Sequence, residues 1–109
     1  MTTMFVGRHQ GTLAWIRRQP IVIDRYLDEF RIECVRPGDT VIGTLPVHLA
    51  AEVCERGARF IAVVMDIPKT KRGLELSEKE VEECRIRLRA FHVEEAEFFP
   101  TTADRSDGS

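Results

Sequence analysis

Residues Asp39–Cys54, DTVIGTLPVHLAAEVC, combine a strand, a tight corner and the start of a helix. The pair Val41–Ile42 is β-branched and follows a turn, which predicts a short strand. Gly43–Thr44 forms the corner, and Pro46 suits the first turn of a helix, where a missing N–H costs nothing. From Leu49 onward, apolar residues recur at helical spacing. The stretch therefore predicts a strand–corner–helix unit.

A corner of this kind has the physical properties of an anion site. Free backbone N–H groups and the positive end of the helix dipole converge where a helix begins. The candidate residues are Gly43, Thr44 and Leu45. We hypothesise that this corner holds a phosphate of a nucleotide ligand.

Length and charge limit the possibilities. With 109 residues and 43% hydrophobic residues, the chain fits one globular domain, which we expect over residues 1–99. Residues 100–109 are polar and predict a disordered tail. The net charge of −2 gives no general attraction to polyanions. We therefore expect no binding of duplex nucleic acid.

We expect a cytoplasmic protein, because we find no targeting signal and because of how cysteine is used. No apolar run approaches the roughly 20 residues needed to span a bilayer, and the first residues do not form a signal peptide. Cys34, Cys54 and Cys84 are odd in number and far apart. This pattern favours reduced thiols over disulfides, and it gives no zinc or other metal site. No cofactor is expected.

The rest of the chain alternates between predicted strands and helices. Strands are expected at 4–7, 21–23, 60–65 and 93–99, and a helix at 12–18 precedes the helix that ends near Gly57. Residues 24–35 mix charged and apolar side chains and could hold a helical turn. The last strand is expected at the edge of the sheet.

A capping box, Ser77–Glu80, predicts the start of another helix. The helix would carry an apolar stripe formed by Val81, Cys84, Leu88 and Phe91. Its acidic first half and arginine-rich second half would complement the helix dipole. We expect this stripe to face the core or a second copy of the chain.

Strands that alternate with helices predict an α/β fold with a mostly parallel sheet, helices on both faces and a small Rossmann-like topology. Such sheets bind ligands beyond the carboxyl ends of their strands. Four segments are expected to meet at that edge: Arg8–His9, Asp24, Gly43–Thr44 and Asp66. The pattern supports a nucleotide or phosphate site without naming the ligand.

Three stretches together resemble a known family: Phe5–Trp15, Gly38–Cys54 and Asp66–Leu76. The chain resembles the CRISPR-associated Csx family number sixteen, from Phe5 to about Val93. One departure is Gln10, where the family is expected to carry proline.

The resemblance implies a CRISPR-associated Rossmann-type fold and a role in type III CRISPR antiviral defence. It implies a ring nuclease that cleaves the second messenger cyclic tetra-adenylate without a metal ion, and so switches off the response. A homodimer is expected from the small chain and the symmetric ligand. The alternative is a protein that binds the cyclic oligoadenylate without cleaving it, as a sink or a sensor.

Two adjacent residues are the candidates for catalysis. Arg8 could grip a phosphate through two hydrogen bonds and stabilise developing charge. His9 could transfer a proton, because its ordinary pKa lies near neutrality. A ribose or adenine contact, or a purely structural role, remains open for His9.

Residues of the central corner are candidates for ligand binding: Gly43, Thr44, Leu45, Pro46 and His48. Thr44 could bond a phosphate oxygen and could equally cap the helix. His48 lies one turn into the helix, where it would face either the ligand or solvent.

Later segments add further binding candidates. Asp66 could orient a ribose hydroxyl or a basic partner. Arg72 could close over the ring as a lid, with Gly73 allowing close backbone approach, or lie in an ordinary solvated loop. Trp15 could stack on adenine, although a core position is the simpler expectation.

Overall fold

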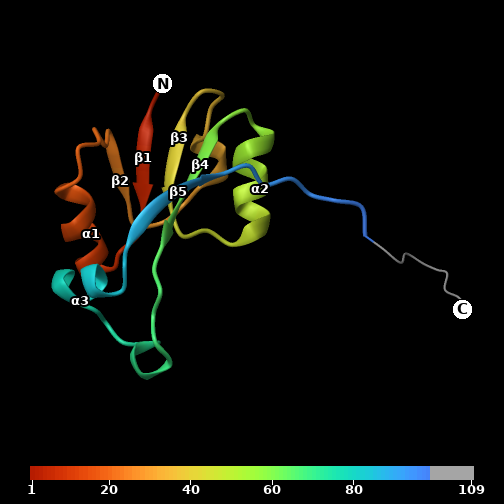
Figure 1. The fold of residues 1–109 in the computed structure, drawn as a ribbon. Helices are drawn as coiled ribbons and strands as arrows, with labels where there is room; N and C mark the ends of the chain where they lie inside the picture. Colours follow the sequence, from red (N-terminus) through yellow and green to blue (C-terminus); the bar gives the residue numbers. More distant parts are fainter. Residues whose placement is uncertain (99–109) are drawn as a thin grey trace, which may run out of the picture.

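The protein forms a five-stranded α/β sheet, described here from a computed structural model that covers residues 1–98 (Figure 1). The strands are β1 (Thr3–Val6), β2 (Arg25–Leu27), β3 (Thr40–Gly43), β4 (Arg59–Val64) and β5 (Arg87–Phe91). Their order across the sheet is β2-β1-β3-β4-β5. Four strands are parallel and β5 runs antiparallel to β4. This confirms the predicted mostly parallel sheet, and the predicted tail at 100–109 lies outside the described residues.

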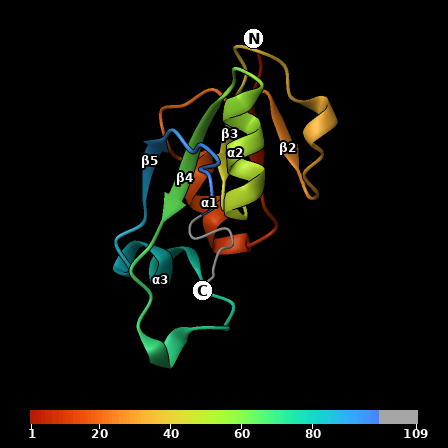
Figure 2. The ribbon, with the colours of Figure 1, turned by 90° about the vertical axis from the view of Figure 1, so that its right-hand side faces the viewer.

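Helices cover both faces of the sheet, as expected for a Rossmann-like fold (Figure 2). The helices and 3₁₀ turns are α1 (Gln10–Arg17), η1 (Ile32–Cys34), α2 (Val47–Glu55), η2 (Lys69–Lys71) and α3 (Glu78–Glu83). Helices α1 and α3 pack side by side on one face, and α2 lies on the other with η1 beside it. None of these helices within residues 1–98 is long and apolar enough to cross a membrane.

Strand β1 supplies both halves of the core, because successive side chains of a strand point to opposite faces. Phe5 packs with Ile16 of α1 and Ile42 of β3 on one face. Met4 packs with Val41 and Val53 on the α2 face. All of these side chains are at most 1% exposed. Each contributes roughly 1.5–3 kcal/mol from burial, so the central strands are firmly fixed.

Helix α2 follows the predicted strand–corner–helix pattern. Pro46 is the N-cap residue, and its carbonyl accepts hydrogen bonds from the Leu49 and Ala50 N–H groups. After the helix, Gly57 has a φ of +84°. A non-glycine residue rarely adopts this left-handed conformation, and the predicted glycine at the end of the helix is confirmed.

The predicted strand at 21–23 is wrong. Ile21 and Val22 are 37% and 81% exposed, and the edge strand β2 begins later, at Arg25. The cause is the pairing of Asp24 with β1. The Thr3 N–H donates to the Asp24 carboxylate, and the Asp24 N–H donates to the Thr3 carbonyl, both at 2.8 Å. This register sets where β2 starts, and the predicted helical turn in residues 24–35 is found as η1.

The predicted helix after Ser77 starts correctly but is much shorter than expected. The capping box of Ser77 and Glu80 is confirmed, yet α3 ends at Glu83. Arg85 then adopts a left-handed φ of 59°, which turns the chain out of the helix. The prediction of a long apolar stripe on one helix is therefore wrong.

Two members of that expected stripe belong to a strand instead. Leu88 lies opposite Val63, and Phe91 lies opposite Phe60, in the β4–β5 pair. The final strand expected at 93–99 is also wrong over residues 93–98, because β5 already occupies the edge of the sheet. Phe99 lies outside the described residues.

Candidate functional site

The carboxyl ends of β1 and β3 lie next to each other, with Val6 paired to Gly43. The chain leaves β1 toward α1 on one face of the sheet and leaves β3 toward α2 on the other. Such a switch point is where open α/β sheets form ligand crevices. A cavity of about 260 Å³ lies here. Its lining residues are Phe5, Val6, Gly7, Arg8, His9, Thr12, Gly43, Thr44, Val63 and Met65.

Arg8 stands at the rim of this cavity, just beyond the end of β1. Its side chain is exposed, and among residues 1–98 no carboxylate forms an ion pair with it. A guanidinium can bind two oxygens of one anion through parallel hydrogen bonds. Arg8 is therefore available to bind an anion in the cavity.

His9 lies beside Arg8, but its ring is already engaged within the protein. It is the N-cap of α1, with Nδ1 3.0 Å from the Thr12 hydroxyl and 3.2 Å from the Thr12 N–H. Its Nε2 accepts a hydrogen bond from the Leu76 N–H at 3.0 Å. Because the strand ends before His9, both Arg8 and His9 reach the same cavity.

The β3–α2 corner forms the opposite wall. Gly43 is buried, and a Cβ at this position would lie 2.6 Å from the Val6 carbonyl oxygen. Thr44 lines the cavity but does not cap the helix, which corrects that alternative, because Pro46 occupies the N-cap and no side chain caps α2. Leu45 and Pro46 continue the corner outside the lining of the cavity. Within residues 1–98, no side chain caps the first N–H groups of α2.

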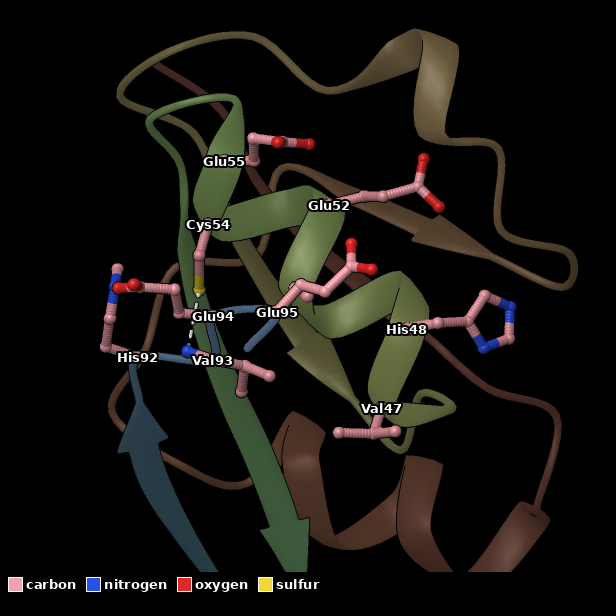
Figure 3. Close-up of a pocket in the computed structure, with 10 residues that line it drawn as sticks. Val47, His48, Glu52, Cys54, Glu55, His92, Val93, Glu94 and Glu95 are labelled. Carbon is pink, nitrogen blue, oxygen red and sulfur yellow. Dashed lines mark hydrogen bonds and ion pairs between the residues drawn. The ribbon is translucent and has the colours of Figure 1, made fainter. Parts of the chain in front are cut away.

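His48 is placed away from this cavity. It is exposed on the outer side of α2 and lines a second groove of about 800 Å³, between α2 and the segment after β5 (Figure 3). Four carboxylates rim this groove: Glu52, Glu55, Glu94 and Glu95. Such a rim repels phosphate, so His48 does not belong with the other candidates for anion binding.

Asp66 follows β4, as expected, but its carboxylate is held by basic partners. It pairs with Arg85 at 3.2 Å and with Arg87 at 3.4 Å. The Asp66 N–H also donates to the Cys84 carbonyl at 2.7 Å. These contacts attach the end of β4 to the start of β5, and they leave Asp66 outside the lining of the cavity.

Arg72 and Gly73 lie on the segment that protrudes beyond the carboxyl edge of the sheet, next to η2 (Figures 1 and 2). The Arg72 guanidinium donates to the Ile67 carbonyl at 3.2 Å. Gly73 has a φ of +82°, and no atom lies within 4 Å of a Cβ built there. This glycine permits a turn, not a close backbone contact, and neither residue lines the cavity.

Asp24 lies at the amino edge of the sheet, so the prediction that it meets the other candidates at the carboxyl edge is wrong. It precedes β2 and bonds to Thr3 at the amino end of β1. Trp15, a residue of α1, packs against two core clusters, which agrees with a core position. Four segments were expected to meet at one edge, and two of them, after β1 and β3, share the cavity.

Sequence reasoning missed several residues of the cavity. Thr12 is a buried polar residue, 7% exposed, on the first turn of α1. Val63 and Met65 form part of the apolar lining. Thr12 lies three residues after the N-cap His9, and this capping spacing was the available signal. Val63 and Met65 gave none, since strand residues of this kind are ordinary core.

Comparison with known families identifies a relationship over most of the chain. Residues 4–94 match the model of the family described as "Putative CRISPR-associated protein (Cas_VVA1548)". The chain belongs to this CRISPR-associated family. Neither curated proteins nor solved structures gave a match.

For this member of the CRISPR-associated family, the cavity combines an apolar floor with a cationic rim. Phe5, Val63 and Met65 can contact a flat apolar group, and Arg8 can bind an adjacent anion. Among residues 1–98, no group of three or more His, Cys, Asp or Glu side chains is arranged to hold a metal ion. The site has the chemistry to bind one phosphorylated, partly apolar ligand group.

Proposed function

We propose that this CRISPR-associated protein is a ring nuclease that binds and cleaves cyclic tetra-adenylate and thereby switches off type III CRISPR defence. The observation that carries the proposal is the Arg8 guanidinium at the β1–β3 cavity, which has no ion-pair partner in the part of the chain that the structure describes. Family membership supports a CRISPR role, and the sequence resemblance supports this particular reaction.

In the proposed reaction, a ribose 2′-oxygen attacks the adjacent phosphorus in line. The bond from phosphorus to the 5′-oxygen breaks, the 2′-hydroxyl loses its proton and the leaving oxygen gains one. The products are linear and end in a 2′,3′-cyclic phosphate. Arg8 would stabilise the negative charge that grows on the phosphoryl oxygens, a contribution often worth roughly 10²–10³-fold in rate.

The β3–α2 corner would hold the phosphate from the other side. The hydroxyl of Thr44, in the lining of the cavity, is a suitable donor, and α2 begins three residues later with no side-chain cap among residues 1–98. Gly43 supports this role, since it lets the corner lie directly against β1. Positioning of this kind can itself supply much of the acceleration, because in-line attack demands a defined geometry.

The size of the cavity supports action as a homodimer. A cavity of about 260 Å³ is smaller than the roughly 300–1,000 Å³ typical of pockets for drug-sized ligands. Four linked nucleotides are far larger than one such ligand. We therefore propose that each protomer holds one part of the ring and that two copies of the chain bind it together.

A second candidate function is binding without cleavage, as a sink or a sensor. The observation that favours it is the engagement of both His9 ring nitrogens, which leaves no free imidazole at the cavity. The two functions share every binding contact and differ only in whether the ring is opened.

Incubation of the protein with radiolabelled cyclic tetra-adenylate in EDTA separates them. We expect multiple turnovers to linear products with a 2′,3′-cyclic phosphate. A stable complex that holds intact ring would favour the binding protein, and a requirement for added metal would refute the metal-independent reaction. Failure to bind any cyclic oligoadenylate would exclude both functions.

Replacement of Arg8 tests the site itself. We expect Arg8→Ala to slow cleavage by roughly 10²-fold or more and to weaken binding by about tenfold. Arg59→Ala is the matched control, because Arg59 is also exposed but begins β4 at the opposite edge of the sheet. Equal activity of the two variants would show that the reaction occurs elsewhere.

A further inference from the structure

A short segment far along the chain lies directly on the start of α1. The Leu76 N–H donates to His9 Nε2 at 3.0 Å, and the Gln10 N–H donates to the Glu75 carboxylate at 3.2 Å. The Leu76 side chain is 3% exposed and packs with Val81 of α3. These contacts join residues more than sixty positions apart, so they hold the segment before α3 on the first turn of α1.

Gly11 shows how closely the two backbones approach. A Cβ on Gly11 would overlap the Leu76 carbonyl oxygen and would lie 2.8 Å from the Ser77 carbonyl oxygen. Backbone atoms cannot move aside as a flexible side chain can. Any side chain at this position must therefore push the Glu75–Ser77 segment away from α1.

Both ring nitrogens of His9 lie against backbone N–H groups of the protein. Nε2 accepts from the Leu76 N–H at 3.0 Å. Nδ1 accepts from the Thr12 N–H at 3.2 Å and lies 3.0 Å from the Thr12 hydroxyl. A general acid or base needs a nitrogen that reaches the reacting group, and both nitrogens of His9 are occupied.

We propose that His9 is a positioning residue: it fastens the Glu75–Ser77 segment to the start of α1 and does not itself transfer protons. This assignment rests on the proposed ring cleavage only for its effect on the reaction. The fastening itself is a property of the folded chain.

The position of His9 explains how this contact would influence the site. The chain between Asp66 and Leu76 is held at one end by the Asp66 ion pairs and at the other by His9. The residues between these two attachments, including Arg72, protrude from the body of the protein (Figures 1 and 2). His9 also sets the direction of the chain just after Arg8. Loss of the His9–Leu76 bond would loosen both the protruding segment and the wall of the cavity.

His9→Asn separates the two functions of the side chain. Asparagine is among the best N-cap residues, so it can still accept from the Thr12 N–H and preserve α1. Its shorter side chain cannot reach the Leu76 N–H at the same time. Residue-resolved amide hydrogen exchange should show Leu76 exchanging roughly threefold to tenfold faster, with β1 and β3 amides unchanged. Unchanged exchange at Leu76 would overturn the proposal.

Two further variants test whether this attachment, and not proton transfer, governs activity. Glu75→Ala removes the contact with the Gln10 N–H from an exposed position, and Gly11→Ala displaces the segment directly. We expect all three variants to accelerate Leu76 exchange and to lower the cleavage rate by a similar factor of about ten or less. Loss of roughly 10²–10⁴-fold in kcat for His9→Asn alone would instead identify a proton-transfer role and refute the proposal.

The readouts also separate this inference from the proposed function. Faster exchange at Leu76 in a protein that never cleaves cyclic tetra-adenylate would support the attachment and refute the ring nuclease. Normal exchange at Leu76 in a His9→Asn variant that still cleaves the ring would support the ring nuclease and refute the attachment.

Discussion

The carboxylate of Asp39 provides the sharpest prediction about stability. It is 5% exposed and accepts hydrogen bonds from the Thr2 N–H and the Arg36 N–H, each at 3.0 Å. These bonds join the segment before β1 to the turn before β3, at the amino edge of the sheet and opposite the cavity. Replacement of Asp39 should therefore change the free energy of unfolding without altering the site.

The pH dependence follows from the same contacts. The hydrogen bond from the Arg36 N–H, followed by that from the Thr2 N–H, lowers the pKa of Asp39 below its ordinary value. A group with a depressed folded-state pKa stabilises the protein fully above its unfolded-state pKa of about 3.9. That stabilisation is lost as the pH falls through the folded-state pKa. Acid should therefore remove the contribution of Asp39.

The size of the effect can be worked out for Asp39→Asn. The amide keeps one acceptor oxygen, so one of the two backbone N–H groups meets an NH₂ group instead. Loss of one hydrogen bond to a charged group costs about 1.5–3 kcal/mol. For a domain of this size, whose total stability is typically about 5–15 kcal/mol, the midpoint of thermal unfolding should fall by roughly 10 °C.

Urea unfolding followed by circular dichroism at pH 7 and at pH 3 or below tests this reasoning. Asp39→Asn should be destabilised at pH 7, and its difference from the wild type should shrink in acid, where the wild-type carboxyl becomes protonated. Asp28→Asn is the control for simple loss of charge, since Asp28 is exposed. A difference that is equal at both pH values, or no difference at pH 7, would refute the argument.

Three further variants test the packing and the caps. Gly43→Ala places a Cβ 2.6 Å from the Val6 carbonyl oxygen and should cost about 1–3 kcal/mol in urea unfolding; wild-type stability would contradict the close β1–β3 contact. Ser77→Ala removes the cap that bonds the Glu80 N–H and should cost about 1 kcal/mol, and an unchanged unfolding midpoint would exclude a contribution from the cap. Arg8→Lys keeps the charge but loses the paired donors, so its cleavage rate should fall between those of wild type and Arg8→Ala, and full activity would exclude a two-point grip.

The alternation of strands and helices was enough to predict the mostly parallel sheet, but not the identity of every strand. Residues 85–90 show why. Leu88 fits a helical stripe that starts at Val81, and it equally fits a strand in which Ile86 and Leu88 alternate with arginines. The local pattern does not distinguish the helical period from the strand period. Pairing with β4 favours the strand, because Leu88 then lies opposite Val63 and packs on the α1 face of the sheet.

The site was predictable where chain order alone brings residues together. Arg8 comes just after β1 and Gly43 is the last residue of β3, and these parallel strands are neighbours in the sheet, so the two residues lie close together. The direction of His48 around α2 and the path of Arg72 beyond η2 depend on packing between distant segments. Neither has a local sequence signal, so the sequence left two alternatives open for each residue, and in the structure neither lines the cavity.

The two walls of the cavity belong to different halves of the chain, and this determines how it can work. One wall comes from the β1–α1 connection on one face of the sheet, and the other from the β3–α2 connection on the opposite face. The two connections diverge, so the space between them remains open without a long loop to shape it. Gly43 brings the walls together at their base, and Arg8 projects at the rim. A phosphate bound here would contact the Arg8 guanidinium on one wall and Thr44 on the other, so the central sheet itself would fix the distance between its two binding groups.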